Sequence, residues 1–329
     1  MNSPVVLPPL HFAQFRFLLR AASPLLLPAR NKGNTLRGAF GTMLRKLCCH
    51  PGCPGAARCE FRATCTYAQV FEPAAPEGSP ALSNYQAIPR PFVIRPPLEE
   101  KTGYQPGETV EFGLILVGRA IEFLPYFVLT FNRLGEEGLG VKRARCALER
   151  VEQLEASGCA TAVVYDGGTR VMRPAAGSIR EVSSACAPQG RALQVRFLTP
   201  TFLAFEGHAV REPQFHHLVR RLRDRLNALA TFYCGGPLVL DFKGLGERAA
   251  AVLRTHCDLR WMARQRQSSR TGRRHDVSGF VGTCAFAGDL AEFLPLLHFG
   301  QYLHVGKHTA WGNGWLSLQA AEETADAHR

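Results

Sequence analysis

The chain has 329 residues, of which 46% are hydrophobic and 20% charged, and its formal net charge is +12. This composition excludes wholesale disorder, because it supplies ample apolar material for one large or two modest buried cores. No apolar stretch approaches the ~20 residues that a membrane-spanning helix needs, and residues 1–10 lack the features of a secretory signal. We therefore expect a globular cytoplasmic protein that has no membrane span and keeps its thiols reduced.

The positive charge is concentrated in one part of the chain. Between Arg211 and Arg274 there are 14 Lys and Arg residues against 5 Asp and Glu residues. Such a local excess is typical of a surface that binds a polyanion. A role in solubility alone is the alternative.

The first half of the chain predicts strands and two helices. Residues 35–47 and 120–134 carry apolar side chains at the three- and four-residue spacing of helices that bury one face. The segments that favour strands, with buried or alternating apolar residues, are 11–21, 92–95, 109–117, 144–154 and 161–165.

A similar order of elements follows in the second half. Residues 213–232 predict a long amphipathic helix, and a shorter helix is expected from an N-cap at Asp289 through Leu297. The segments that favour strands are 192–198, 257–262, 280–286 and 311–318.

Both halves thus read as βαββαβ, which is the ferredoxin-like order. We predict an α+β fold with two tandem ferredoxin-like domains and antiparallel sheets, at residues 1–185 and 186–329. A Cys-rich insertion at residues 48–72 interrupts the first domain. No sequence repeat supports the duplication, so it depends on the order of elements alone.

A glycine-rich segment lies at residues 300–314, between the last helix and the last strand. Its glycines allow the backbone to approach a ligand closely, and His304, Lys307 and His308 supply polar or cationic side chains. It lacks the Walker A order, which argues against a nucleotide hydrolase. A phosphate-binding loop and a plain turn-rich connection both remain open from these residues.

Several motifs resemble those of one family, the CRISPR pre-crRNA-processing endoribonucleases of the RAMP superfamily. In the second half the resemblance extends from Trp261 to Leu318 and is strongest in His304-Val305-Gly306-Lys307-x-Thr309-x-Trp311-Gly312-x-Gly314. In the first half it is carried by Leu36-Arg37-Gly38-Ala39-Phe40-Gly41 and by Cys65-x-Tyr67-x-x-x-Phe71-Glu72.

The resemblance implies RRM-related domains that bind CRISPR repeat RNA and cut it once without a metal. The 2′-hydroxyl would attack the neighbouring phosphate and leave a 2′,3′-cyclic phosphate and a 5′-hydroxyl. The expected partners are repeat RNA, crRNA and other CRISPR effector subunits, with no membrane and no small-molecule cofactor. Two alternatives stay open: a non-cleaving RAMP subunit that holds guide RNA, and, with less support, a zinc-dependent nucleic-acid regulator.

The family also implies a catalytic His near the first helix, but residues 35–47 contain neither His nor Tyr. The nearest imidazole is His50, and Lys46 is a nearby cation. A His can move protons near neutral pH, and a cation can stabilise the charge of a phosphorane. We take His50, Lys46 and His308 as catalytic candidates, while His50 has metal binding as its alternative role.

The RNA-binding candidates are the arginines of the basic stretch together with residues of the glycine-rich segment. Arginine suits phosphate because its donors form a planar fork, although a solvated helix face also explains part of the group. The candidates are Arg220, Arg221, Arg264, Arg266, Arg270, Arg273, Arg274, His304, Gly306, Lys307, Gly312 and Gly314.

Five of the eleven cysteines lie between Cys48 and Cys65. In a reducing compartment such a local cluster favours metal ligation over disulfides. Cys49, or Cys48 in its place, would join Cys53, Cys59 and Cys65 as four thiolate ligands of one structural Zn²⁺. An iron–sulfur cluster and a thiol-rich loop without metal are the alternatives.

Overall fold

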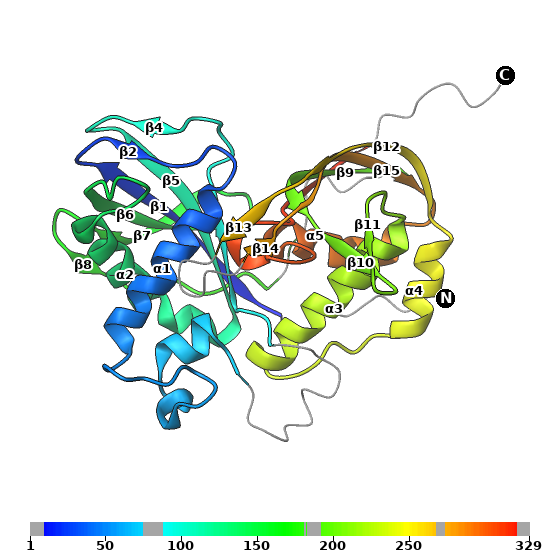
Figure 1. Ribbon diagram of the computed structural model, residues 1–329. Coiled ribbons are helices and arrows are strands. Elements are labelled where there is room, and N and C mark those ends of the chain that lie inside the picture. The colour runs from blue at the N-terminus through cyan, green and yellow to red at the C-terminus, as the bar shows by residue number, and fades with distance from the viewer. Residues whose placement is uncertain (1–9, 75–87, 181, 183–191, 268–273, 321–329) are drawn as a thin grey trace. The chain divides into compact units, whose positions relative to one another are not determined.

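The computed structural model describes residues 10–74, 88–180, 182, 192–267 and 274–320 (Figure 1). It divides into two compact units. The first comprises Pro9–Arg180 and Ala228–Gly236, and the second comprises the described residues of Glu181–Asn227 and Pro237–Arg329. The predicted boundary at residue 185 stays a prediction, because residues 183–191 lie outside the described part.

The first unit has an antiparallel six-stranded sheet in the order β3-β5-β1-β6-β7-β8. Two helices alternate with its main strands, and short 3₁₀ or π turns are labelled η. Its elements are β1 (Phe12–Ala21), β2 (Leu25–Leu26), α1 (Lys32–Cys48), η1 (Glu60–Ala63), η2 (Tyr67–Phe71), β3 (Phe92–Arg95), β4 (Gly103–Tyr104), β5 (Thr109–Val117), η4 (Gly118–Phe123), α2 (Leu124–Glu137), β6 (Cys146–Leu154), β7 (Ala160–Asp166) and β8 (Val171–Met172).

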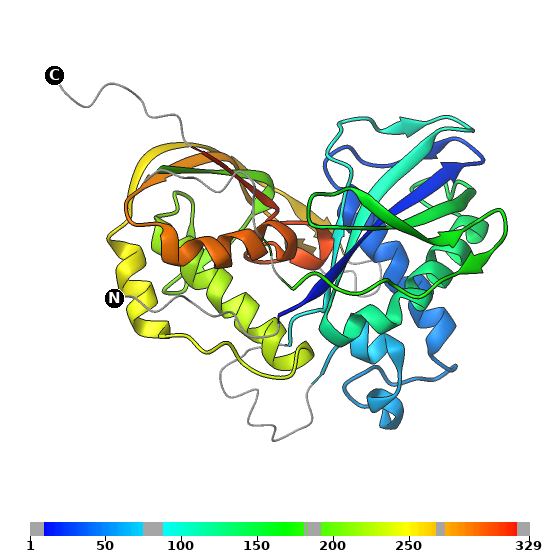
Figure 2. The ribbon, with the colours of Figure 1, turned by 180° about the vertical axis from the view of Figure 1, so that it is seen from behind.

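Aromatic rings fill the space between this sheet and its helices. α1 and α2 lie side by side over one face of the sheet, and the view from behind shows the opposite face (Figures 1 and 2). Phe40 of α1 stacks on Phe127 of α2 at 4.4 Å between ring centroids, and Phe17 of β1 stacks on Phe112 of β5 at 5.1 Å. The predicted apolar faces therefore form the core of this unit.

The second unit has an antiparallel four-stranded sheet in the order β12-β15-β9-β16. Two small hairpins, β10–β11 and β13–β14, accompany it. Its elements are β9 (Ala192–Thr201), β10 (Leu203–Phe205), β11 (His208–Val210), α3 (Phe215–Tyr233), α4 (Phe242–Ala250), β12 (Leu253–Met262), β13 (Gln265–Gln267), β14 (Arg274–Asp276), β15 (Gly279–Ala287), η5 (Ala291–Phe293), α5 (Leu294–Leu303), η6 (Thr309–Trp311) and β16 (Leu316–Ala320). The last turn of α3 belongs to the first unit.

The strand orders confirm the predicted topology in both units. In each sheet the first strand of the βαββαβ series is central and pairs with the third and the fourth, while the second strand pairs with the third. This is the ferredoxin-like arrangement. No helix in the described part of the chain is long and apolar enough to cross a membrane.

Two local predictions were wrong, and one helix was missed. Asp289 does not cap the last helix, because α5 begins at Leu294 after a 3₁₀ turn, with Pro295 in its first turn. The final strand begins at Leu316 rather than Trp311, since residues 309–311 form a 3₁₀ turn. Helix α4 was not predicted, although Asp241 marks its start by accepting a hydrogen bond from the Gly244 N–H at 2.9 Å.

Candidate nucleic-acid interface

The glycine-rich segment forms a loop that is fastened to the end of β9. The Gly314 N–H donates to the Pro200 carbonyl at 3.0 Å, and the Val305 N–H donates to the Gly314 carbonyl at 2.9 Å. The buried Thr199 hydroxyl donates to the Gly312 carbonyl at 2.7 Å. These bonds fix the loop backbone, so the side chains between Val305 and Gly312 are presented in a defined position.

Two glycines are required by this geometry. Gly306 has φ +83° and Gly314 has φ +73°, a region that side chains other than glycine rarely adopt. A Cβ atom on Gly306 would lie 2.3 Å from the Phe202 carbonyl oxygen, and one on Gly314 would lie 1.8 Å from the Val305 carbonyl oxygen. Gly306 therefore allows the loop to pack against the segment after β9, and Gly314 allows close backbone packing within the loop.

His304 lies inside the loop, and its predicted contact with RNA stays a prediction. Its side chain is buried, its ring stacks on Trp315, and its Nδ1 lies 3.1 Å from the Asn313 carbonyl oxygen. Because the imidazole packs inside the loop, it supports the loop conformation.

A group of cations lies against aromatic rings where the loop meets the β13–β14 hairpin. The Arg266 guanidinium lies 4.8 Å from the centroid of the Trp311 ring, and the His308 ring stacks on the same indole at 4.4 Å. The His308 Nε2 also lies 3.1 Å from the Asp276 carbonyl oxygen. Loop and hairpin are thus joined through one half-buried indole.

The pattern continues beside the loop. The exposed Lys307 places its Nζ 4.5 Å from the centroid of the Phe202 ring, and Arg211 lies 5.0 Å above Trp261. Phe202 and Trp261 are themselves 6.2 Å apart. These seven residues form what we term the cation–aromatic surface: Arg211, Trp261, Phe202, Lys307, His308, Trp311 and Arg266.

The arginines of α3 are largely engaged within the protein. Arg221 donates through Nε to the Ala204 carbonyl at 2.8 Å, and Arg220 lies over the Phe205 ring at 5.5 Å, so both hold the β10–β11 hairpin against the helix. Arg223 and Arg225 donate to backbone carbonyls of Phe242 and Leu303. Much of the predicted basic helix face therefore has a structural role in this unit.

The remaining arginine candidates belong to the β13–β14 hairpin or lie beside it. Arg274 is exposed at the start of β14, and Arg264 directly precedes β13, where its backbone N–H binds the Ser278 hydroxyl at 2.9 Å. Arg270 and Arg273 lie outside the described residues. Their predicted contact with RNA stays a prediction.

The two catalytic candidates of the first unit lie near the end of α1. The exposed Lys46 ammonium is 2.7 Å from the Glu137 carboxylate and lowers the pKa of that carboxyl group. His50 is exposed just beyond the helix, with Nδ1 2.7 Å from the Pro51 carbonyl oxygen. Both side chains are exposed. The third catalytic candidate, His308, lies in the second unit.

The first-half motif that carried the family resemblance is a packing motif. Gly41 leaves room for the Phe71 ring, since a Cβ there would lie 1.8 Å from the ring. The buried Arg37 guanidinium lies 4.0 Å from the centroid of the same ring, and Tyr67 donates to Glu72 at 3.0 Å. The motif therefore fixes η2 against α1.

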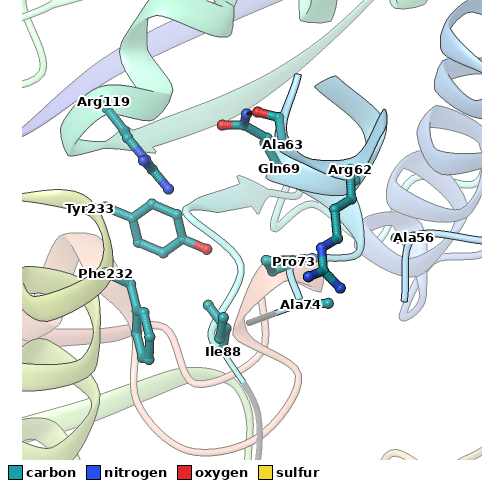
Figure 3. A pocket seen from close by; sticks show the side chains of 11 residues that line it. Ala56, Arg62, Ala63, Gln69, Pro73, Ala74, Ile88, Arg119, Phe232 and Tyr233 are labelled. Atoms are coloured by element: carbon teal, nitrogen blue, oxygen red, sulfur yellow. Dashed lines mark hydrogen bonds between the residues drawn. The ribbon is translucent and has the colours of Figure 1, made fainter. Parts of the chain in front are cut away.

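A cavity of about 280 Å³ lies within the first unit (Figure 3). Arg62 and Arg119 enter it from separate segments, and Tyr233 lines it while donating to the Pro89 carbonyl at 2.8 Å. Its two guanidinium groups suit an anionic group. Sequence reasoning missed this cavity because its walls come from distant parts of the chain.

The predicted zinc ligands lie close together after α1, although no set of three or more Cys, His, Asp or Glu side chains in the described residues is already arranged to hold a metal ion. Burial, followed by the neighbouring Cys53 and Cys65 thiols, raises the pKa of Cys49. The zinc site therefore stays a prediction.

The structure thus defines a class of α+β protein with two tandem ferredoxin-like units and a glycine loop whose neighbouring cations lie against aromatic rings. Residues 195–316 match the family model described as CRISPR-associated endoribonuclease Cas6. Residues 9–177, about half of the chain, match the model of the AF_1859 N-terminal domain. The chain therefore belongs to the CRISPR-associated pre-crRNA endoribonucleases of the RAMP superfamily.

Solved structures agree with this assignment at the level of the fold. A Cas6 product complex matches with a TM-score of 0.53 and 18% identity, covering 94% of this chain and 99% of that chain. Thermus thermophilus Cas6 matches with a TM-score of 0.51 and 19% identity, over 94% and 98%. A partial Cas6-RT-Cas1–Cas2 complex matches with a TM-score of 0.56 and 14% identity, over 96% of this chain and 47% of that chain. Among curated proteins no sequence matches.

Proposed function

We propose that this protein binds CRISPR repeat RNA through its second unit and cleaves precursor crRNA to give guide RNAs. The observation that carries the proposal is that the Cas6 family match, residues 195–316, includes all the residues of the cation–aromatic surface. Exposed or half-exposed cations that lie on rings offer hydrogen-bond donors to the RNA phosphates, and the rings offer faces on which bases can stack. Binding of a single-stranded or splayed RNA segment requires both.

The proposed reaction needs no metal. The RNA 2′-hydroxyl oxygen forms a bond to the adjacent phosphorus, and the bond from that phosphorus to the 5′-oxygen of the next nucleotide breaks. A base accepts the 2′-hydroxyl proton, an acid returns a proton to the leaving 5′-oxygen, and the products are a 2′,3′-cyclic phosphate and a 5′-hydroxyl. His50 is our candidate for a proton transfer, with Lys46 stabilising the phosphorane charge and His308 as the alternative imidazole.

Repeat RNA incubated with the protein in EDTA tests this reaction, with the fold monitored by circular dichroism in the same buffer. We expect one cut, a cyclic phosphate end, and no cut when the nucleotide 5′ of the scissile phosphate carries 2′-deoxyribose. In single-turnover assays His50→Ala should retain repeat binding and cleave far more slowly. Unchanged cleavage by this variant would remove His50 from the mechanism.

One observation favours a second candidate function. Helix α1, Lys32–Cys48, contains no His or Tyr, so the family's usual position for a catalytic side chain is unfilled by those types. A RAMP subunit that holds guide RNA without cutting it would bind the repeat in the same assay and leave it intact.

A further inference from the structure

Two cysteines of the second unit lie directly opposite each other on neighbouring strands. In the antiparallel pairing of β12 with β15, which lie side by side in Figure 1, Cys257 is the partner of Cys284. Side chains of directly opposite residues point to the same face of a sheet. The two sulfur atoms are 3.3 Å apart, and neither belongs to a disulfide. The fold therefore holds two thiols in contact although they are far apart in the chain.

The position of this pair in the ladder suits a disulfide. Opposite residues of antiparallel strands have Cα atoms about 4.5 or 5.5 Å apart, depending on the type of pair. Both distances lie within the range of roughly 4.4 to 6.8 Å that is found across disulfides. An S–S bond of ~2.05 Å requires the two sulfur atoms to approach by about 1.3 Å more. Rotation of the two side chains can supply this approach, so the strands need not move.

The two thiols differ in their access to solvent. Cys284 is buried in the middle of the sheet, whereas Cys257 is half-buried on the edge strand β12. Burial, followed by the neighbouring Cys257 thiol, raises the pKa of Cys284, so this thiol stays protonated at neutral pH. An oxidant that arrives from solvent therefore meets Cys257 first, and Cys284 lies in position to react with the oxidised sulfur.

We propose that Cys257 and Cys284 form a reversible redox pair, which hydrogen peroxide converts into a cross-strand disulfide. The Cys257 sulfur bonds to one peroxide oxygen and the O–O bond breaks; the thiol proton goes to the other oxygen, which leaves as water. The Cys284 sulfur then bonds to the Cys257 sulfur and displaces the hydroxyl group, which leaves as a second water with the Cys284 proton. The two sulfur atoms lose two electrons in total, and the peroxide gains them.

The disulfide fastens the edge of the four-stranded sheet. β12 is its edge strand, and none of the residues of β12 is fully buried, so little apolar packing holds the strand in place. A covalent link to β15 restricts the unfolded chain and so stabilises the strand that also carries Trp261. In a reducing compartment such disulfides are usually transient, and the dithiol is then the resting state. The proposal does not depend on RNA cleavage.

Peptide mapping of the full-length protein tests the proposal. Reduced protein is treated with hydrogen peroxide, its remaining thiols are alkylated, and it is digested with trypsin without reductant. Trypsin places Cys257 in residues 255–260 and Cys284 in residues 275–307, and neither peptide contains another cysteine. We expect mass spectrometry to find these two peptides joined, with the loss of two hydrogen atoms, and dithiothreitol to separate them.

Two variants show whether the link is specific. Cys257→Ser should remove the joined peptide, whereas Cys159→Ser, at an exposed thiol of the first unit, should retain it. Oxidation should raise the thermal unfolding midpoint of the wild type by roughly 5 to 10 °C. The same treatment should not raise the midpoint of Cys257→Ser.

The map of the wild type decides the question even if a serine variant fails to fold. Oxidation of the exposed Cys159 in the same sample shows that enough peroxide was present. Recovery of the Cys257 and Cys284 peptides unlinked from that sample would overturn the proposal. So would a map in which Cys257 is joined to cysteines of the first unit as often as to Cys284, because the contact within the sheet would then not direct the pairing.

Discussion

The two units share the order of their four core strands, and each holds cations against aromatic rings, but these cations differ in burial. In the first unit Lys32 is buried, with Nζ 2.7 Å from the Glu99 carbonyl oxygen and 3.7 Å from the Glu99 carboxylate, and Arg37 is buried over Phe71. In the second unit Arg266 and Lys307 lie over rings on the half-exposed loop and hairpin.

This difference separates cations that pack inside the fold from cations that stay accessible at the surface. A buried cation is costly unless its neighbours compensate it, so Lys32 and Arg37 contribute to the fold of the first unit. A cation that rests on a ring at the surface keeps donors for an incoming phosphate and lies beside a face on which a base can stack. The same topology therefore carries buried cations in the first unit and, in the second, cations that lie on rings at the surface.

The largest effect is expected from Gly314→Ala in the loop of the second unit. The added Cβ would have to displace the Val305 carbonyl, and the positive φ would strain the backbone as well. We expect a loss of roughly 3 kcal/mol in the free energy of unfolding, together with loss of RNA binding. Urea unfolding and RNA filter binding measure the two effects.

Gly207→Ala provides the matched control for this variant. Gly207 also has a positive φ, +83°, but an added Cβ there would have open space, with no neighbouring atom within 4 Å. The free energy of unfolding of Gly207→Ala should fall by only about 1 kcal/mol, because backbone strain is the only cost. This variant should bind RNA as the wild type does. Equal losses in the two variants would show that close packing of the loop is not what Gly314 serves.

In the first unit the corresponding test is Gly41→Ala on α1. The added Cβ would overlap the Phe71 ring, which packs against the Arg37 guanidinium. Because the ring has to move, we expect the free energy of unfolding to fall by about 2 kcal/mol. Gly38 lies one turn earlier and has open space around it. Gly38→Ala should raise the free energy of unfolding by roughly 0.5 to 1 kcal/mol, because Ala favours a helix more than Gly does. Thermal unfolding compares the pair, and a stabilised Gly41 variant would contradict the packing role of the motif.

The fold was predictable because burial leaves a periodic signature. Phe40 and its apolar neighbours recur at helical spacing, and the central strands β1 and β9 are rich in buried residues. Apolar periodicity could not predict where η6 ends and β16 begins. An irregular turn lies there, and the residues on either side of η6, His308 and Gly312, have a positive φ. Helix α4 was missed because it is only nine residues long and contains Gly244 and Gly246, which disfavour a helix.

The candidate site was predictable only in part, because charge along a sequence does not reveal what each charge contacts. Arg221 and Arg266 are both arginines of the basic stretch, yet one binds a backbone carbonyl and the other lies on Trp311. Trp261 and Trp311 were recognised as motif residues, but their role as rings beneath cations depends on tertiary contacts. The position of His304 inside the loop depends on the same contacts.

A smaller effect is expected when the stacking pair is removed. Arg266→Ala and Trp311→Ala, combined, delete one cation and one ring of the cation–aromatic surface, and repeat RNA should bind about tenfold to a hundredfold more weakly. Fluorescence anisotropy at several salt concentrations measures the affinity and also its salt dependence, to which Arg266 should contribute.

Arg248→Ala is the control for the loss of charge. Arg248 belongs to the same unit but pairs with Glu292 at 2.8 Å on the surface and is not a member of the cation–aromatic surface. Its removal should change binding little. If Arg248→Ala weakens binding as much as the double variant, net charge rather than the stacked arrangement determines affinity.

The smallest effect concerns pH and an imidazole of the second unit. Desolvation, followed by the charges of His216, Arg220 and Arg254, lowers the pKa of His217 to about 4, while its ring lies 4.6 Å from Phe205 and its Nδ1 accepts from the Gln214 N–H. In the unfolded chain the His217 imidazole has a pKa of ~6.5 and binds a proton between pH ~6.5 and 4, whereas in the folded protein it stays neutral. The stability that depends on the neutral imidazole is therefore present above pH ~6.5 and is lost as the pH falls toward 4.

His217→Gln keeps a hydrogen-bond acceptor and removes the titrating group. The thermal unfolding midpoint of this variant should therefore fall less than that of the wild type between about pH 7 and pH 5. The exposed His208→Gln should follow the wild type, and a His217 variant that does the same would show that the imidazole is hydrated and the neighbouring cations do not act on it.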